Sequence, residues 1–396
     1  MKMKIVVVVP YLKSFGGEFL SFSTAGASRY AWELSEYLST QGDDVVVASL
    51  YVDKTVYSSD TKLKIIDFGD EKNLTQLLNF WINFKKFIKS LHKIIDQEKP
   101  DIVFFNHYPC TMWVEKYDNL PIICYPQDIN LLYTDTYINN LPTKTRILWR
   151  IIRLFVRSYD KRKWKLFDEV ISHSKFTAQN IKKHYGIDAP LMYLGTNTRV
   201  FSPDKNNIKK NAILPLGDSK IRRADLLIKA ASKLRKKRND FEIWIVGNKN
   251  DLDLELKNLV KTLGLEENIK FFGQISDSKL SKLYSEALAT VHLVKEAPFG
   301  LIVTESMSCE TPVISWKPGG PEETIIDGET GFLIPEDNES ELIKKIEIFL
   351  DSPELSKKMG KKARENVLSR FNLEIHHHNM REHLLDWIKK KPHENH

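Results

Sequence analysis

Short runs of β-branched and apolar residues alternate with longer amphipathic segments along the whole chain. In the first half, these runs predict strands at residues 4–10, 44–50, 62–68, 101–106, 121–125 and 169–174. The segments between them repeat apolar residues at helical spacing and predict helices near residues 26–41, 73–96, 143–165 and 175–185. The first run, KIVVVVP, is apolar at almost every position, as is typical of a strand buried on both faces. The alternation predicts βαβ units and a parallel sheet.

The same alternation begins again after a segment rich in turn-forming residues at 190–207. Here the predicted strands, each followed by a helical segment, lie at 212–217, 241–247, 268–273, 289–294 and 311–316. The chain closes with predicted helices at about 354–368 and 374–390. We therefore expect an α/β fold of two Rossmann-like, doubly wound domains facing across a cleft. The expected bounds are 1–198 and 199–374, with a helix at 375–396 packing back toward the first domain.

Composition supports an ordinary globular protein of two domains. The chain has 396 residues, of which 42% are hydrophobic and 28% charged, so disorder is not expected. Its three cysteines, Cys110, Cys124 and Cys309, form no CxxC pair and are too few for a disulfide framework. The apolar run at the N-terminus is too short for a signal peptide, and no stretch approaches the roughly 18 apolar residues of a membrane span. We expect a cytoplasmic protein.

The most informative stretch is residues 292–334, where glycines follow predicted strands and precede predicted helices. Gly300 occupies such a position, and a helix start with free backbone N–H groups is a natural site for a phosphate. Gly319–Gly320 repeats the arrangement before the next helix. Glu296 and Glu305 flank the first glycine, and carboxylates accept hydrogen bonds from sugar hydroxyls. Taken alone, Glu305 could equally be a solvated helix carboxylate and the glycine pair a simple turn.

Together the segments FGLIVTESM, CETPVISW and GGPEETIIDGETGFL resemble the donor site of GT-B glycosyltransferases. The specific resemblance is to the retaining glycosyltransferase family 4 (glycosyltransferase group 1), which includes sucrose synthases and lipid-linked mannosyltransferases. It covers most of the chain, closely over about 240–370 and loosely over 1–200. The resemblance implies that Glu305 contacts the nucleotide ribose. It also implies that the diphosphate is bound by the backbone amides of Phe299, Gly300, Leu301 and Ile302.

The family's first motif glutamate, which holds hydroxyls of the donor sugar, aligns with Ala297 in this chain. The carboxylate lies one place earlier, and we assign the role to Glu296. The family also clamps the diphosphate with a basic pair early in the second domain, since the leaving group gains negative charge in the transition state. Here the candidates are Lys220, Arg222 and Arg223, of which Arg222 aligns best; plain surface charge is the alternative. The segment FFGQIS resembles the edge that holds the base, which implies roles for Phe272, Gly273 and Gln274.

The first half carries a weaker resemblance to the family's acceptor domain. The loop at 14–38 resembles the family's GG-x-x-R loop, which implies donor or acceptor contacts for Gly17 and Arg29. His107 follows a predicted strand, where relatives have a histidine in the acceptor pocket, although a lone histidine is often structural. Relatives often carry a second histidine after the next strand. In this chain that position is Cys124 or Gln127, and only Asp128 adds another polar group there.

The net charge of +7 is concentrated in the first half of the chain. Residues 1–200 hold 27 basic and 21 acidic residues, and residues 201–396 hold 32 and 31. Residues 143–167 hold nine basic residues and a single acid, Asp160. Arginines and apolar residues recur there on neighbouring helical faces, namely Arg146, Arg150, Arg153 and Arg157 beside Ile147, Ile151, Leu154 and Phe155.

Such a helix, with Trp149 and Trp164 near its ends, is typical of one that lies on an anionic bilayer. A second basic and aromatic stretch at 79–95 could reinforce the contact. The alternative is an ordinary amphipathic helix that covers the sheet with its arginines in solvent.

We therefore expect a glycosyltransferase that moves a hexose from a nucleotide-diphosphate sugar to a lipid-linked or membrane-proximal glycan, with retention of configuration. The expected catalytic residues are Glu296, Glu305, Arg222, Lys220 and His107. We expect no cofactor and no metal, because adjacent histidines at 376–378 point in different directions on a helix. The expected location is cytoplasmic, peripheral at the inner membrane face.

Two other interpretations remain open. The first is an epimerase or phosphorylase on the same scaffold, and the second is a catalytically silent, membrane-associated protein that kept the fold. Nucleic-acid binding is not expected, because it would leave the glutamates unexplained. A dinucleotide oxidoreductase is also not expected, because no G-x-G-x-x-G follows the first strand of either domain.

Overall fold

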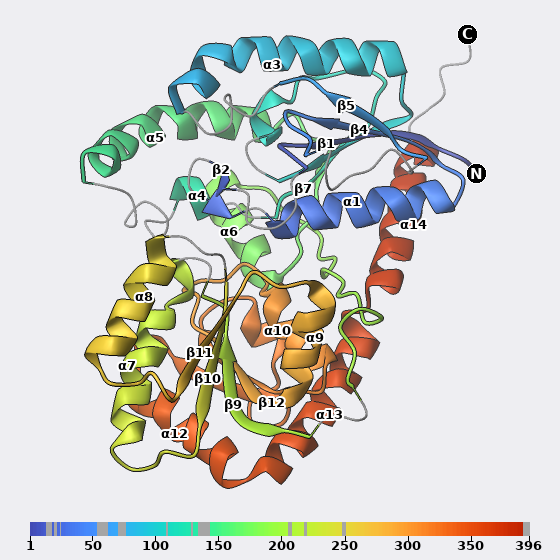
Figure 1. Ribbon diagram of the computed structural model, residues 1–396. Helices are drawn as coiled ribbons and strands as arrows, with labels where there is room; N and C mark the ends of the chain where they lie inside the picture. Colours follow the sequence, from blue (N-terminus) through green and yellow to red (C-terminus); the bar gives the residue numbers. More distant parts are fainter. Residues whose placement is uncertain are drawn as a thin grey trace. The chain divides into compact units, whose positions relative to one another are not determined.

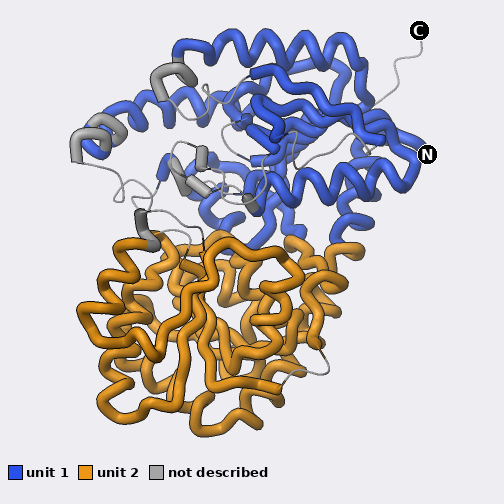
Figure 2. Tube along the Cα trace, in the orientation of Figure 1, with its two compact units in different colours: residues 1–192, 376–396 blue, residues 193–375 orange. Residues whose placement is uncertain are grey.

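The computed structural model describes residues 1–12, 18–19, 22–23, 25–53, 62–69, 77–107, 110–127, 130–133, 143–204, 208–217, 220–247 and 251–390. Contacts between residues divide the chain into two units (Figure 2). Unit 1 comprises residues 1–192 and 376–396, and unit 2 comprises residues 193–375. The second boundary falls inside the last helix, so most of that helix belongs to unit 1.

Unit 1 is built on a six-stranded parallel sheet with the strand order β5-β4-β1-β6-β7-β8. Its strands are β1 (Lys4–Val9), β4 (Asp44–Ser49), β5 (Lys64–Asp67), β6 (Ile102–Asn106), β7 (Ile122–Tyr125) and β8 (Glu169–Val170), with a separate hairpin of β2 (Glu18–Phe19) and β3 (Phe22–Ser23). Its helices are α1 (Ala25–Thr40), α3 (Leu77–Glu98), α4 (Asn130–Tyr133), α5 (Thr143–Trp164), α6 (Lys175–Tyr185) and the 3₁₀ helix η1 (Cys110–Trp113). Helices α3 and α5 lie on one face of the sheet, and α1 and α14 on the other (Figure 1).

Unit 2 repeats this plan with a six-stranded parallel sheet in the order β11-β10-β9-β12-β13-β14. Its strands are β9 (Lys210–Pro215), β10 (Glu242–Val246), β11 (Ile269–Gly273), β12 (Ala287–His292), β13 (Val313–Lys317) and β14 (Gly331–Pro335). Its helices are η3 (Lys220–Arg222), α7 (Ala224–Arg235), α8 (Asp251–Thr262), α9 (Asp277–Glu286), α10 (Leu301–Ser308), α11 (Pro321–Thr324), α12 (Glu339–Asp351) and α13 (Pro353–Arg370), followed by α14 (Leu373–Lys390).

Both sheets have the same doubly wound order. The first strand lies in the middle, the next two extend the sheet to one side, and the last three extend it to the other. The chain therefore changes direction beside the first strand, between β1 and β6 in unit 1 and between β9 and β12 in unit 2. This confirms the predicted α/β class with two Rossmann-like sheets. Ligands of such sheets bind beyond the carboxyl ends of the strands at this point of reversal.

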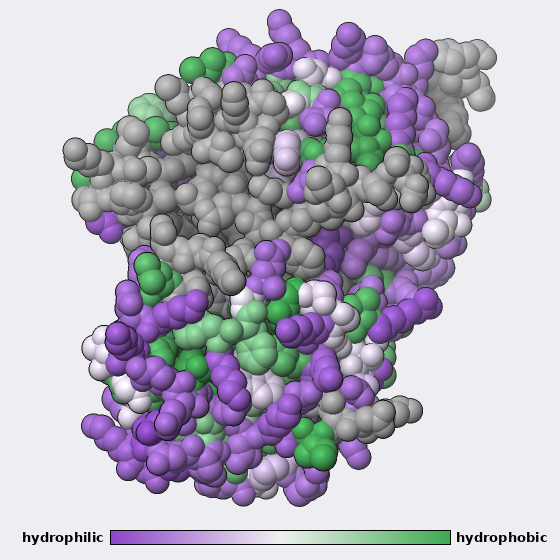
Figure 3. Space-filling model, in the orientation of Figure 1, coloured by the Kyte–Doolittle hydropathy of each residue, from purple (hydrophilic) through white to green (hydrophobic). Residues whose placement is uncertain are grey.

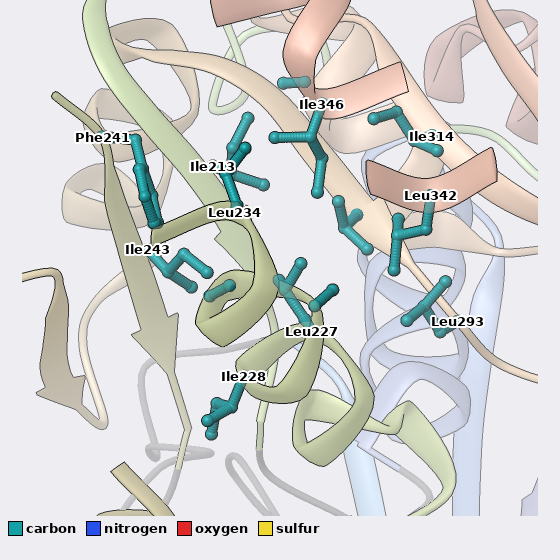
Figure 4. Close-up of a cluster of buried hydrophobic side chains, with 14 of the residues drawn as sticks. Ile213, Leu227, Ile228, Leu234, Phe241, Ile243, Leu293, Ile314, Leu342 and Ile346 are labelled. Carbon is teal, nitrogen blue, oxygen red and sulfur yellow. The ribbon is translucent and has the colours of Figure 1, made fainter. Parts of the chain in front are cut away.

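Successive side chains along a strand point to opposite faces of the sheet, so unit 2 has two clusters of buried side chains. On β9, Ile213 belongs to one cluster of buried side chains and Leu214 to the other. The first cluster joins the strands to α7 and α12, whose Leu227 and Ile346 point toward it (Figure 4). The second cluster includes Tyr284, which has no exposed surface. With both faces covered, these strands read as near-continuous apolar runs, which is why they could be predicted.

Besides the hairpin of β2 and β3, which was not predicted, two strands of the parallel sheets differ from the prediction. The segment 331–335 was not predicted as a strand, yet it forms β14 at the sheet edge, in parallel register with β13 from Val313↔Gly331 onward. A side chain at Gly331 would place its Cβ 2.3 Å from the Val313 carbonyl oxygen, so a glycine lets the strands pair. In contrast, β8 is much shorter than the predicted 169–174. The Ile171 amide still donates to the Cys124 carbonyl of β7, but the next amide, that of Ser172, donates to the carbonyl of Pro190 at 2.8 Å.

The last helix, α14, is joined to unit 1 by polar contacts along its length. The Arg381 guanidinium forms an ion pair with Asp43, with Nε 2.7 Å from Oδ2. The Trp387 indole donates to Glu169 Oε2 at 2.8 Å. His376 Nε2 lies 3.0 Å from the hydroxyl of Tyr30 on α1. These contacts join α14 to α1, to the residue before β4 and to β8.

Candidate functional site

The turn between β12 and α10 has the geometry of an anion site. Gly300 precedes the helix with φ +89°, a conformation that residues other than glycine rarely adopt. A Cβ at this position would also lie 3.2 Å from Cγ2 of Val303. The first backbone N–H groups of a helix have no partner within the helix, and its dipole favours negative charge there. The turn at Gly300 therefore presents an electropositive helix start at the carboxyl end of β12.

The glycine pair after β13, Gly319 and Gly320, packs against the loop that leads into this turn. The Gly320 amide donates to the carbonyl of Ala297 at 2.8 Å. A Cβ on Gly320 would lie 2.4 Å from Cα of Phe299 and 2.6 Å from the carbonyl oxygen of Pro298. Backbone packs directly on backbone here, so Gly320 fixes the path of the loop at 297–299.

The two glutamates lie at different depths around this turn. Glu305 is only 8% exposed on α10, four residues after Leu301 and so on the same side of the helix. Helical side chains lean toward the N-terminus, which directs its carboxylate toward the Gly300 turn. Glu296 is partly exposed and has φ +49°. Its neighbour Lys295 forms an ion pair with Glu336 at 2.7 Å.

The three candidate cations after β9 have different surroundings. The Lys220 ammonium pairs with Glu255 of α8 at 3.0 Å, and both side chains are more than half exposed. Arg223 lies near two carboxylates, with Nε 3.2 Å from Asp225 Oδ1 and Nη1 3.7 Å from Asp337 Oδ1. Its guanidinium carbon lies 6.0 Å from the centroid of the Trp316 ring.

Arg222 lies beside the end of β12. Burial and, to a smaller extent, the charge of Arg222 lower the pKa of His292 to about 3. The charge of Arg222 therefore acts on His292, whose Cε1 would lie 3.7 Å from a Cβ added at Gly300. The neutral His292 ring also contacts Ser315 of β13 at 3.2 Å through Nδ1.

The segment predicted to hold the base lies at the carboxyl end of β11. It is therefore at the same end of the parallel sheet as the turn that follows β12. Gly273 has φ +66°, and its carbonyl accepts from the Gly247 amide at 3.2 Å. The Phe272 ring is partly buried against Trp244, with ring centroids 5.8 Å apart. Gln274 is exposed immediately after the strand. A partly open aromatic ring beside an exposed amide can stack on and hydrogen-bond a flat ligand.

Unit 1 has its own cluster of polar groups at the carboxyl ends of β6, β7 and β8. His107 follows β6 with φ +77° and is 8% exposed. Gln127 donates to Asn106 Oδ1 at 3.2 Å, and Asn106 donates to the Ala27 carbonyl of α1 at 2.9 Å. His173, beyond β8, lies 2.9 Å from the Gln127 carbonyl through Nε2.

Burial keeps both of these imidazoles neutral. It lowers the pKa of His107 to about 3, with His173 contributing, and the pKa of His173 to about 4. The sequence prediction missed His173, although a polar residue at the end of a parallel strand is the signal that could have found it. Of the other predicted residues, Arg29 is a partly exposed residue of α1, while Gly17 and Asp128 lie outside the described residues.

Buried histidines should make the fold sensitive to mild acid. His107, His173, His292 and His377 all have pKa values lowered by burial to about 3 or 4. Between these values and pH 6.5 the unfolded chain binds more protons, so the free energy of unfolding falls with falling pH, by about 1.4 kcal/mol per histidine and pH unit. Asp160, with a pKa raised by burial to about 7, acts in the opposite direction.

We expect urea unfolding to show a lower stability at pH 5.5 than at pH 7. Between pH 7 and pH 5.5, the free energy of unfolding of the His377→Leu variant should fall by about 1.4 kcal/mol less than that of the wild type. An identical loss in the variant and the wild type would contradict this assignment.

Family models match both halves of the chain. The model "Glycosyl transferases group 1" matches residues 202–366, and the model "Glycosyltransferase Family 4" matches residues 24–199. The first range includes the Gly300 turn, Glu305 and Arg222. The chain belongs to the group 1 glycosyltransferases.

Known group 1 glycosyltransferases resemble the chain at modest identity. D-inositol 3-phosphate glycosyltransferase of Streptomyces bingchenggensis is 26% identical over 218 residues, which are 50% of this chain and 48% of that protein. The chain thus spans about half the length of this curated relative.

Solved structures with the GT-B fold match nearly the whole of this group 1 glycosyltransferase. Sucrose-phosphate synthase of Thermosynechococcus elongatus gives a TM-score of 0.81 at 19% identity, covering 98% of this chain and 100% of that one. Anabaena HepE in complex with UDP and glucose gives a TM-score of 0.73 at 17% identity, covering 97% and 100%. At these identities the likeness establishes the fold alone.

The described residues of this glycosyltransferase show no grouping of three or more His, Cys, Asp or Glu side chains that could hold a metal ion. Within the same residues, no helix combines the length and the apolar character needed to cross a membrane.

Proposed function

We propose that this chain is a hexosyltransferase that uses a nucleotide-diphosphate sugar, retains the anomeric configuration and needs no resident cofactor or metal. The observation that carries the proposal is the Gly300 turn, held by Gly320 and followed by the buried Glu305, with the charge of Arg222 acting on His292 beside it. An electropositive helix start, a buried carboxylate and a cation are the groups that a diphosphate and a ribose require. A relative in fold, Anabaena HepE, was solved with UDP and glucose, which is consistent with this donor class.

Each group has a defined part in the proposed reaction. The turn amides at 299–302 and Arg222 offset the charge that grows on the leaving diphosphate. Glu305 accepts hydrogen bonds from the ribose hydroxyls, and Glu296 from hydroxyls of the transferred hexose. Phe272, Gly273 and Gln274 hold the base. Positioning and charge stabilisation then supply most of the rate, and the donor phosphate assists deprotonation of the acceptor.

We assign the acceptor to unit 1 and propose a lipid-linked or membrane-proximal glycan. The neutral imidazole of His107 can donate and accept a hydrogen bond, which suits sugar hydroxyls. The single N–H of neutral His173 is directed to the Gln127 carbonyl, so this histidine supports the cluster from within unit 1. Neither histidine can act as an acid at neutral pH, because their pKa values lie near 3 and 4. The proposed location is the cytoplasmic face of a membrane, where such acceptors are accessible.

Two measurements test this function. Thermal unfolding with a panel of nucleoside diphosphates should show one base that raises the Tm by several degrees, since a ligand at 100 times its Kd stabilises by about 2.7 kcal/mol. The matching nucleotide sugars are then incubated with and without glycan acceptors, and the products are analysed by NMR. A product formed without acceptor would favour an epimerase. No shift with any nucleotide would refute the proposal and favour a catalytically silent protein.

Variants of the cations should separate the diphosphate clamp from surface charge. Arg222→Gln should weaken nucleoside diphosphate binding about 30-fold, because one or two charge-assisted hydrogen bonds contribute about 2 kcal/mol. Lys220→Gln should change it less than about threefold, because its ammonium is in an exposed pair with Glu255. Isothermal titration calorimetry measures both. A larger loss for Lys220→Gln than for Arg222→Gln would reverse the assignment.

A further inference from the structure

Helix α5 has apolar side chains on two opposite faces, and only one of them is buried in unit 1. Val156 and Trp164 belong to the core, with exposed fractions of 7% and 1%. On the opposite side, four large apolar side chains follow helical spacing and face outward. Their exposed fractions are 56% for Ile147, 54% for Ile151, 59% for Leu154 and 76% for Phe155. We call these four residues the outward stripe.

This arrangement differs from an ordinary amphipathic helix that covers a sheet. Such a helix turns its single apolar side inward, whereas the outward stripe lies about half a turn of the helix away from Val156. A contiguous row of exposed apolar side chains on a soluble protein marks a surface that binds something. Green atoms are visible at the edge of unit 1 where α5 lies (Figure 3).

The charged residues around the outward stripe are basic. Arg150, Lys161 and Arg162 are exposed on α5. The only acidic residue of the helix, Asp160, is fully buried and accepts a hydrogen bond from the Tyr185 hydroxyl at 2.6 Å. The exposed surface of α5 therefore carries positive charge that no carboxylate of the helix offsets.

Helix α3 packs beside α5 and adds to this basic character. Phe84 of α3 meets Tyr159 of α5 edge-on, with ring centroids 5.8 Å apart. On the same helix, Ile82 is 69% exposed. Four lysines of α3 are also exposed, namely Lys85, Lys86, Lys89 and Lys93. Two neighbouring helices thus combine exposed aliphatic and basic side chains.

We propose that the outward stripe is a docking surface for an anionic lipid bilayer. Ile147, Ile151, Leu154 and Phe155 enter the boundary between head groups and acyl chains, and the flanking basic residues contact lipid phosphates. A second copy of the chain fits less well, because a symmetric contact through α5 would bring the same arginines together. The proposal deepens the membrane-proximal acceptor proposed above, but the docking test needs no transfer activity, so the two can fail separately.

Vesicle co-sedimentation of the full chain at low salt tests this docking. The wild type should bind vesicles with 30% phosphatidylglycerol at least about tenfold more tightly than vesicles of phosphatidylcholine alone, and added salt should weaken the binding. The double variant Leu154→Ser/Phe155→Ser should bind the anionic vesicles at least about tenfold less tightly. Its thermal unfolding should stay unchanged, because both side chains are already exposed.

Leu254→Ser is the matched control, since Leu254 of α8 is 60% exposed in unit 2 and should not affect lipid binding. Wild-type protein that does not sediment with anionic vesicles would overturn the proposal, as would a double variant that binds like the wild type. Light scattering that shows a dimer lost in the double variant, without vesicle binding, would assign the surface to a second copy instead.

Discussion

Glu305→Ala should weaken binding of the nucleoside diphosphate by at least about 100-fold and remove detectable sugar transfer. The buried carboxylate is assigned to two ribose hydroxyls, and charge-assisted hydrogen bonds contribute about 1.5–3 kcal/mol each. Calorimetry measures the affinity, and the transfer assay measures the rate. The fold should persist, because alanine is the best helix former and Glu305 lies inside α10.

The matched control for this variant is Glu354→Ala on α13, whose carboxylate side chain is 80% exposed in a surface pair with Lys357. It should leave both affinity and transfer unchanged. Glu305→Gln keeps the shape and one acceptor oxygen, so its affinity should fall between those of alanine and wild type. Full activity in Glu305→Ala would remove this residue from the site.

Gly320→Ala should disrupt the donor loop, although Gly320 itself is not assigned to the ligand. The added Cβ would lie 2.4 Å from Cα of Phe299, so the loop at 297–299 must move. Forcing an extra carbon into packed backbone costs about 1–3 kcal/mol, and the displaced amides should weaken diphosphate binding more than tenfold. Calorimetry and urea unfolding measure the two effects separately.

Two other glycines make this prediction specific. Gly360→Ala would place a Cβ 2.0 Å from the Glu310 carbonyl oxygen, so it should lower stability while the folded protein keeps its affinity. Gly264 has φ +63° and no atom within 4 Å of the added carbon, so Gly264→Ala should cost about 1 kcal/mol and leave binding intact. If Gly320→Ala bound the diphosphate normally, the glycine pair would be only a turn.

Periodicity predicted most of the fold because the sheets are buried on both faces. Runs such as KIVVVVP indicate that burial directly. In contrast, β14 was not predicted, because its five residues lie inside a motif and at a sheet edge. Sequence spacing also placed Gly300 and Glu305 at one helix start. It could not rank Lys220, Arg222 and Arg223, because their roles depend on carboxylates such as Glu255 that are distant in sequence.

The same limit applies to unit 1 and to α5. His173 reaches the cluster around His107 only because β6, β7 and β8 are neighbours in the sheet. The helical pattern of α5 indicated an amphipathic helix, but it could not show which apolar side faces the core. Residues such as Val156 and Phe155 are adjacent in sequence and apolar, and only packing separates them into 7% and 76% exposure.

Hydrogen–deuterium exchange tests the central claim most directly, that a diphosphate binds at the start of α10. The protein is compared alone and with the nucleoside diphosphate that gives the largest thermal shift. We expect slower exchange at the amides of Phe299 to Ile302 and in the segment that carries Arg222. Unchanged exchange there, with protection at some other part of the chain, would contradict the assignment.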